Sequence, residues 1–368
     1  MDSPITQKTL CKMGASVVRR FVLWTLILAI MMLCGCNAWM NGSYASVTPH
    51  KEQNFLPEQT MMTPKTYEDV IQILENMVKS GQHRSTISME KMDEDWHRYI
   101  EDVVDYVRDI CPIGAYAVSD ITYDISTNNG KAAISVEISY RRSIADIDAV
   151  MYAESTEEIE EILQNALKAF SVCVTVCVED YAGYDFDQMV QDYALAYPQY
   201  VIETPQVSAT MYPNDGKDRI VELVFNYDTS RASLQQMQEQ VSRIFSAAET
   251  YVSGDGLPME KFAQMYAFLM SRYNYTVQSS GTPAYSLLYH GIGDSKAFAS
   301  VFSAMCSQAG LECKVISGVC SGQSWYWNEI CVEDKVYYVD LLRCQEMGKF
   351  FCKTAQEMTE YDWENITH

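Results

Sequence analysis

Basic residues are scarce in this sequence of 368 residues. Lysine and arginine together number 27 against 49 aspartates and glutamates, and the formal net charge is −22. A surface this acidic repels nucleic-acid phosphates and anionic lipid headgroups, so we expect no nucleic-acid partner. Cationic partners and polycationic wall components remain possible. The simpler interpretation is that the charge keeps the protein soluble.

Histidine is rarer still, and the patterns of the common metal sites are absent. The sequence contains only five histidines, which are His50, His83, His97, His290 and His368. It has no Cys-x-x-Cys pair and no histidine-rich tract, so the usual ligand spacing of a zinc site is missing. The acidic residues also lack the glycine-punctuated spacing of an EF-hand loop. We therefore expect neither a metal site nor a cofactor.

The apolar run near the N-terminus is too short to span a bilayer. It covers the thirteen residues 21–33, whereas a membrane-spanning helix needs about 20. Basic residues precede the run and the small residue Gly35 follows it, which is the layout of a secretory signal. We therefore predict a signal segment at residues 1–35, followed by a Gly-, Ser- and Asn-containing tether at residues 36–63.

The end of this segment carries the motif Leu33-Cys34-Gly35-Cys36. The motif and the preceding apolar run resemble bacterial lipoprotein signals, in which the final cysteine is lipidated. The resemblance implies lipidation of Cys36 and a location on the extracytoplasmic face of the cell membrane. An uncleaved anchor and plain secretion remain alternatives. With a lipid or an uncleaved anchor, the protein contacts the membrane through its N-terminal segment.

Six of the twelve cysteines are crowded into the last third of the chain, at positions 306, 313, 320, 331, 344 and 352. An exported protein can form disulfides, but six cysteines allow 15 pairings and the sequence does not choose among them. Buried free thiols are an equally good interpretation, because cysteine packs as a small hydrophobic residue.

A weak internal repeat follows the tether. Residues 66–76 resemble residues 155–165, and both stretches space their apolar residues as an amphipathic helix does. Each copy continues with alternating apolar and polar residues after an Asn-Gly or Asp-Gly turn, a pattern typical of β-hairpins. We therefore predict two tandem repeated α/β modules, at residues 64–152 and 153–230. Neither contains a recognisable catalytic set.

Two helices, at residues 232–252 and 258–273, are predicted to open the last part of the chain, residues 231–368. Several short motifs follow in order. They are Gly-Ile-Gly-Asp-Ser at residues 291–295, a small-residue helix, a strand ending at Gly318, Trp-Tyr-Trp-Asn at residues 325–328, and Tyr-Tyr-Val-Asp at residues 337–340. In this order and spacing they resemble the transglutaminase-like domain, a relative of the papain-like cysteine proteases. The resemblance implies a papain-like α+β domain after the two modules, and an α+β fold class for the whole protein.

The resemblance also implies the position of a Cys–His–Asp triad. In that family the cysteine lies at a helix N-terminus, a histidine on a following strand is the base, and an aspartate orients the histidine. These positions fall on Ser295, Trp325 and Asp340, so the nucleophile and the base are both substituted. His290 precedes Ser295 by five residues and does not match the position of the base. Cys306 lies three turns into the predicted helix, where cysteines usually pack.

These substitutions favour a domain that binds without catalysing. Ser295 is expected to be the N-cap of its helix, and Asp340 to be a simple hydrogen-bond acceptor. Trp325, Tyr326, Trp327, Asn328 and Tyr289 are the candidate binding residues, with core packing as the alternative for the aromatic ones. We thus expect a membrane-anchored, catalytically inactive lipoprotein that binds a peptide, protein or cell-wall ligand. The alternatives are an active acyltransferase or peptidase that uses Ser295, and a spacer that supports another envelope protein.

Overall fold

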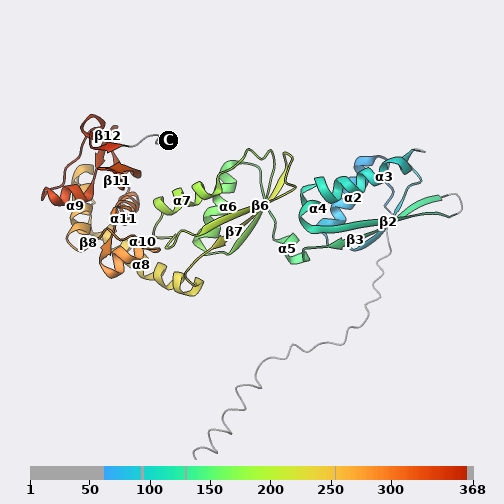
Figure 1. The fold of residues 1–368 in the computed structure, drawn as a ribbon, viewed down its shortest axis with the longest axis horizontal. Helices are drawn as coiled ribbons and strands as arrows, with labels where there is room; N and C mark the ends of the chain where they lie inside the picture. Colours follow the sequence, from blue (N-terminus) through green and yellow to red (C-terminus); the bar gives the residue numbers. More distant parts are fainter. Residues whose placement is uncertain (1–61, 93–94, 129–130, 253, 363–368) are drawn as a thin grey trace, which may run out of the picture. The chain divides into compact units, whose positions relative to one another are not determined.

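The computed structural model describes residues 62–92, 95–128, 131–252 and 254–362 (Figure 1). The predicted signal segment, the lipidation site Cys36 and nearly all of the predicted tether lie outside these residues. The described chain is a mixed α+β structure with several small sheets. No helix within these ranges has the length and apolar character that crossing a membrane requires.

The first sheet has three antiparallel strands in the order β1-β3-β2. Helices α2, α3 and α4 lie along one of its faces (Figure 1). Thr66 caps α2 in a capping box with Asp69, as its position before the amphipathic stretch predicts. The elements are α2 (Tyr67–Lys79), β1 (Arg84–Ser88), α3 (Trp96–Asp105), the π-helical turn η1 (Tyr106–Ile110), α4 (Pro112–Ala117), β2 (Val118–Asn128), β3 (Lys131–Tyr140) and α5 (Ile144–Asp148).

The second sheet has four strands in the order β4-β5-β7-β6, with β4 parallel to β5 and the other pairs antiparallel. Ile159, Leu163 and Leu167 of α6 pack with Phe186 and Val190 of α7 and with the inward residues of the sheet. The elements are β4 (Met151–Ala153), α6 (Thr156–Lys168), β5 (Cys173–Val178), α7 (Phe186–Ala196), β6 (Gln206–Tyr212) and β7 (Arg219–Asn226). The predicted hairpins are confirmed by the β2–β3 and β6–β7 pairs.

Arg142 connects the first two sheets. It follows β3, and its guanidinium Nη2 lies 2.7 Å from Glu222 Oε2 on β7. The same group lies over the rings of Tyr116 and Tyr212, 4.6 and 5.7 Å from their centroids. Because the guanidinium pairs with a carboxylate and stacks on two rings, this contact fixes the neighbouring elements more firmly than an exposed ion pair would.

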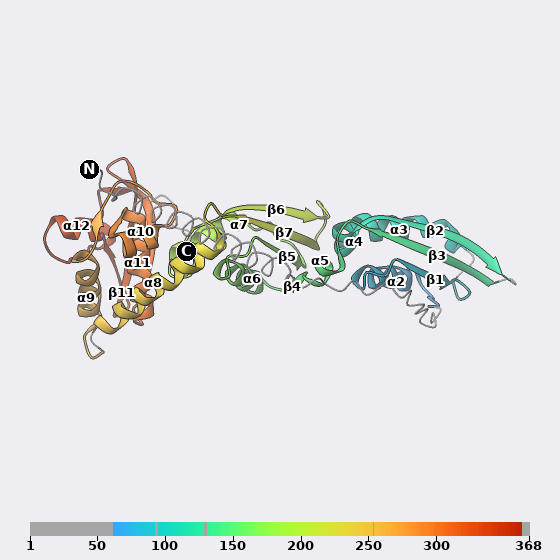
Figure 2. The same ribbon diagram turned by 90° about the horizontal axis from the view of Figure 1, so that it is seen from below.

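The C-terminal part begins with helices and ends with the third sheet, whose strand order is β12-β11-β10-β13. Figure 2 shows α8 beside α10 and α11. The elements are α8 (Arg231–Tyr251), α9 (Pro258–Met270), β8 (Asn274–Tyr275), α10 (Pro283–His290), β9 (Ile292–Gly293), α11 (Ser295–Gln308), β10 (Cys313–Cys320), β11 (Gln323–Val332), β12 (Lys335–Val339), α12 (Leu341–Glu346), the 3₁₀ turn η2 (Ala355–Glu357) and β13 (Tyr361–Asp362).

Helix α11 is the central helix of this part. Nearly all of its first three turns is buried, because alanine and serine alternate with Phe298, Val301 and Phe302 and allow neighbouring elements to approach on every side. Asn328 of β11 joins the sheet to the helix by donating a 2.9 Å hydrogen bond to the carbonyl oxygen of Ala299. The start of α11 is thereby held against the third sheet.

The nine cysteines of the described residues are all free thiols. Cys306, Cys313, Cys320 and Cys344 are buried, which corresponds to the free-thiol interpretation of the C-terminal group. Cys173 and Cys177 lie on one face of β5, as their spacing predicts, without pairing.

Candidate functional site

Asp340 lies where strand β12 ends and helix α12 begins. It is the N-cap of α12, and its Oδ1 accepts hydrogen bonds from the backbone N–H groups of Leu342 at 3.0 Å and Arg343 at 3.2 Å. A carboxylate suits this place because it satisfies N–H groups that have no partner within the helix. One oxygen of Asp340 is therefore committed to the backbone.

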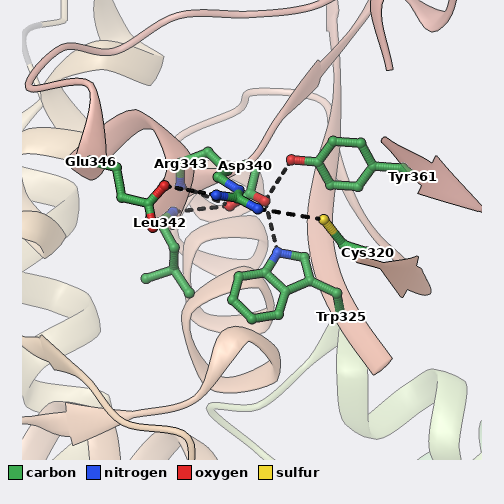
Figure 3. A network of polar contacts seen from close by, with 7 residues as sticks. All are labelled: Cys320, Trp325, Asp340, Leu342, Arg343, Glu346 and Tyr361. Atoms are coloured by element: carbon green, nitrogen blue, oxygen red, sulfur yellow. Dashed lines mark hydrogen bonds and ion pairs between the residues drawn. The ribbon is translucent and has the colours of Figure 1, made fainter. Parts of the chain in front are cut away.

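The other oxygen, Oδ2, accepts two side-chain hydrogen bonds (Figure 3). The indole Nε1 of Trp325 donates at 2.7 Å, and the hydroxyl of Tyr361 donates at 2.8 Å. Asp340 is only 5% exposed, so these bonds replace water around a buried carboxylate. The expectation that Asp340 is a hydrogen-bond acceptor is confirmed. Burial, and then the neighbouring Asp340 charge, raise the pKa of Tyr361 far above its usual value.

Figure 3 shows Arg343 beside Asp340, between Glu346 and Cys320. Its Nη1 pairs with Glu346 Oε2 at 2.9 Å, and its Nη2 lies 4.0 Å from the Sγ of Cys320. The hydrogen bond with Glu346 is the main cause that raises the pKa of Arg343 above its usual value. The guanidinium thus forms an ion pair within α12.

Ser295 is the first residue of α11, and the N-cap is Asp294. This corrects the expectation that Ser295 caps the helix. Both residue types are good caps, but the backbone of Asp294 is extended while Ser295 is already helical, and Asp294 Oδ1 accepts from Ala297 N at 2.9 Å. The Ser295 side chain therefore does not cap the helix. It is 7% exposed, and its hydroxyl has no hydrogen-bond partner among the described residues.

A pocket of about 380 Å³ lies at the start of α11. Of the predicted site residues, it brings together Ser295, Trp325 and Tyr326. Asp340 does not line the pocket, because it lies behind the indole of Trp325 to which it is bonded. Ser295 and Trp325, which the sequence resemblance aligns with the nucleophile and the base, therefore border one pocket, and Asp340 supports Trp325 from the interior.

Trp327 and Asn328 occupy the interior. Both are 0% exposed, and neither borders the pocket. A Cβ atom on Gly318 of β10 would lie 2.6 Å from the Trp327 ring, so glycine is needed there for the ring to pack. Core packing, the alternative weighed for the aromatic residues, therefore holds for Trp327.

Tyr289 lies elsewhere, at the end of α10. It is 55% exposed and stacks on Tyr285 with ring centroids 4.9 Å apart. His290 packs against both rings, at 5.2 and 5.3 Å. Tyr289 is consequently an exposed residue apart from the pocket that Ser295 borders.

No histidine of the described residues borders the pocket. His83 and His97 belong to the first sheet and α3, and His290 faces the tyrosines of α10. Cys306 is fully buried, and burial raises the pKa of its thiol well above the usual value. Within the described residues, Ser295 therefore has no histidine at its pocket, and Cys306 is a buried thiol that does not line it.

Several residues of the site escaped the sequence analysis. Tyr275, Asp294 and Lys296 border the pocket, and Tyr361 binds Asp340. Asp294 and Lys296 could have been found from their places on either side of Ser295 at a helix start. No sequence signal indicated Tyr361, which reaches Asp340 from a two-residue strand 21 positions later.

Within the described ranges, no group of three or more His, Cys, Asp or Glu side chains is arranged to hold a metal ion. The polar groups of the site include hydroxyls, the Gln323 amide, one lysine, one capping aspartate and the buried Asp340. These groups can bind a ligand through hydrogen bonds and charge.

Among solved structures, the chain resembles a candidate cysteine protease from Cytophaga hutchinsonii with 12% identity and a TM-score of 0.26, covering 43% of this chain and 70% of that one. A TGase matches with 8% identity and a TM-score of 0.26, over 52% of this chain and 58% of that one. A candidate protease from Parabacteroides distasonis matches with 10% identity and a TM-score of 0.22. The match covers 69% of this chain and 39% of that one. These likenesses are partial.

The sequence match is more specific than these structural likenesses. No curated protein matches the chain. The family model of the transglutaminase-like superfamily matches residues 246–341. That range contains Ser295, Trp325 and Asp340 and ends directly after the capping aspartate. Residues 246–341 are therefore a transglutaminase-like domain.

Proposed function

We propose that this protein is a membrane-anchored envelope protein whose transglutaminase-like domain is catalytically inactive and binds a peptide, protein or cell-wall ligand. One observation carries the proposal. The indole of Trp325 stands at the position of the family's base and donates its N–H to Asp340 at 2.7 Å. The pocket beside Ser295 is the proposed binding site.

The absence of catalysis follows from the chemistry of indole. An imidazole can donate one proton to an aspartate and accept another from the nucleophile, whereas indole has a donor and no acceptor. A serine hydroxyl needs such an acceptor far more than a cysteine thiol does. With Trp325 in this place, the position aligned with the base offers the Ser295 hydroxyl no proton acceptor.

Binding is supported by what the pocket retains. It is about 380 Å³ in volume, within the range of small-ligand sites, and it combines aromatic walls with a few polar groups. Trp325 is held rigidly by Asp340, so its ring is presented in one orientation. Rigid aromatic surfaces bind ligands at a low cost in conformational entropy.

The test is an assay of amide hydrolysis and amide transfer on glutamine-containing peptides with the full-length protein. We expect no turnover from the wild type, from Ser295→Ala or from the matched control Ser324→Ala, whose serine also borders the pocket. Turnover that Ser295→Ala abolishes and Ser324→Ala keeps would establish the rival function, an acyltransferase or peptidase that uses Ser295.

The proposed anchor is a lipid on Cys36. It rests on the sequence alone, and metabolic labelling with a radioactive fatty acid tests it. We expect Cys36→Ser to abolish the label, and Cys34→Ser to keep it as a matched control. Equal labelling of both variants would remove Cys36 as the anchor.

We also propose that residues 64–152 and 153–230 are tandem repeats, which would form a spacer between the membrane and the pocket. Their strand orders support this. The first sheet runs β1-β3-β2, with Met62 bridged in parallel to Ile87 of β1, and the second runs β4-β5-β7-β6 with β4 parallel to β5. If the repeats are independent folding units, residues 64–152 expressed alone should unfold cooperatively, and a non-cooperative transition would contradict this.

A further inference from the structure

The floor of the pocket is rich in hydrogen-bond donors. Ser295 is more than nine-tenths buried, borders the pocket, and has a hydroxyl without a partner among the described residues. It also begins α11, a helix of 14 residues. The first N–H groups of a helix have no partner within it, and Asp294 satisfies only that of Ala297. The remaining donors favour a ligand oxygen.

Lys296 adds a positive charge to these donors. Its side chain borders the same pocket, and its ammonium lies 5.9 Å from the centroid of the Tyr326 ring. Across the described part of the chain it makes no ion pair. A cation that borders a pocket and makes no ion pair among the described residues is available to pair with an anionic ligand.

Asp294 is the opposing charge at the pocket. Its carboxylate caps α11, so it faces the positive end of the helix and is partly compensated there. It still weakens the attraction of an anion, and the anion must therefore gain from several donors at once. A carboxylate does so, because its two oxygens can accept from the hydroxyl, the backbone and the ammonium together.

The walls of the pocket are aromatic. The ring centroids of Tyr275 and Trp325 are 5.8 Å apart. The ring of Tyr326 lies next to the ammonium of Lys296. Such walls suit the flat peptide groups that precede a chain terminus. Capture of a C-terminal carboxylate by donors of the backbone is a known mode of peptide recognition.

We infer that the pocket binds the free C-terminal carboxylate of a short peptide, held by Ser295, the start of α11 and Lys296. This rests on the proposed binding function and specifies its ligand. A peptide with a blocked C-terminus keeps the stacking surfaces but loses the charge, so it should bind more weakly.

The experiment is calorimetric titration of the full-length protein with acetyl-alanyl-alanine and with its C-terminal amide. We expect the acid to bind about tenfold more tightly, the size of one charge-assisted hydrogen bond. High salt should weaken the binding of the acid and leave the binding of the amide unchanged. Mass spectrometry of the recovered peptides monitors hydrolysis.

Three variants and one control locate the effect. Lys296→Gln should weaken binding of the acid about tenfold, and Ser295→Ala about fivefold, by the same scale. Asp294→Asn keeps a good cap and removes the negative charge, so it should tighten binding about threefold. Lys335→Gln is the matched control, since Lys335 is exposed and does not border the pocket. Thermal unfolding of each variant verifies its fold.

The outcomes separate the two proposals. Equal binding of the acid and the amide, or binding of neither at millimolar concentration, overturns the carboxylate inference. So does a Lys296→Gln variant that behaves like Lys335→Gln. Hydrolysis of the amide to the acid overturns the proposed function instead, because it demonstrates catalysis.

Discussion

Trp325 of strand β11 and Asp340, which directly follows the neighbouring strand β12, share a 2.7 Å hydrogen bond in which the indole donates to the buried carboxylate. The aspartate thus still positions the side chain at the place of the base. The side chain that it positions has no atom that can take a proton. Under the proposed function, the support of the site is retained without its acid–base chemistry.

The first prediction concerns the two donors that share Oδ2 of Asp340. Trp325→Phe and Tyr361→Phe should each lower the free energy of unfolding by about 1 kcal/mol, because one donor still satisfies the oxygen. The double variant should lose about 3 kcal/mol, since the oxygen is then buried without a partner. Denaturant unfolding measures both. Additive losses would indicate that water replaces the donors, and Tyr326→Phe, a neighbouring tyrosine, is the control.

The second prediction concerns a cysteine and a histidine introduced at the positions that align with the nucleophile and the base. Ser295→Cys combined with Trp325→His places a thiol at the helix start and an imidazole beside Asp340. A helix N-terminus and a neighbouring histidine both lower the pKa of a thiol. At pH 7, iodoacetamide should modify the introduced thiol about tenfold faster in the double variant than in Ser295→Cys alone. Peptide mass spectrometry distinguishes the introduced cysteine from the native ones. Equal modification rates in the two variants would mean that the side chain at position 325 does not reach position 295.

The third prediction concerns alkaline pH. Burial raises the pKa of the Cys344 thiol from 9.0 to about 12, and that of Cys352 to about 11. A raised folded pKa contributes stability that is complete below pH 9 and is lost as the pH rises through 11 to 12. The denaturation midpoint should therefore fall between pH 9 and 11, and more steeply in the wild type than in Cys344→Ala.

Thiol labelling provides an independent check of the same burial. At pH 8 an alkylating reagent should modify the exposed Cys173 first and leave Cys344 unmodified. Labelling of Cys344 at the rate of Cys173 would contradict the burial from which the pH dependence follows.

The fourth prediction concerns the contact between the first two sheets. Arg142→Lys keeps the charge but loses the planar group that stacks on Tyr116 and Tyr212 while binding Glu222. It should lower the free energy of unfolding by about 1–2 kcal/mol. Arg84→Lys is the matched control, because the Arg84–Glu137 pair is 74% and 51% exposed and should contribute under about 1 kcal/mol. Equal losses in a denaturant titration would remove the special role of Arg142.

The sequence was informative where local rules decide the structure. Period-two alternation and the Gly-containing turns predicted the hairpins, and apolar spacing predicted α6 with Ile159 and Leu163 in its core face. The ordered motifs were enough to identify the transglutaminase-like segment and to align Ser295, Trp325 and Asp340 with its triad. These features depend on residues that are near one another in the chain.

Other features were decided only by tertiary contacts. Trp325 and Trp327 are two residues apart on one strand and have the same residue type, yet the first borders a pocket and the second is fully buried. Trp327 is covered by Tyr361, with ring centroids 5.0 Å apart, and packs over Gly318. Strand periodicity gives the face of a side chain and not what covers it.

The cap of α11 illustrates the same division. The sequence placed two good caps, Asp294 and Ser295, side by side at a helix start and offered no local reason to prefer the second over the first. The path of the chain through β9 makes Asp294 extended and Ser295 helical, which leaves the Ser295 hydroxyl in the pocket. The sequence by itself determined which groups are available, through their chemistry and local spacing. The tertiary structure decided which of them are satisfied within the protein and which face a ligand, because distant segments supply or withhold their partners.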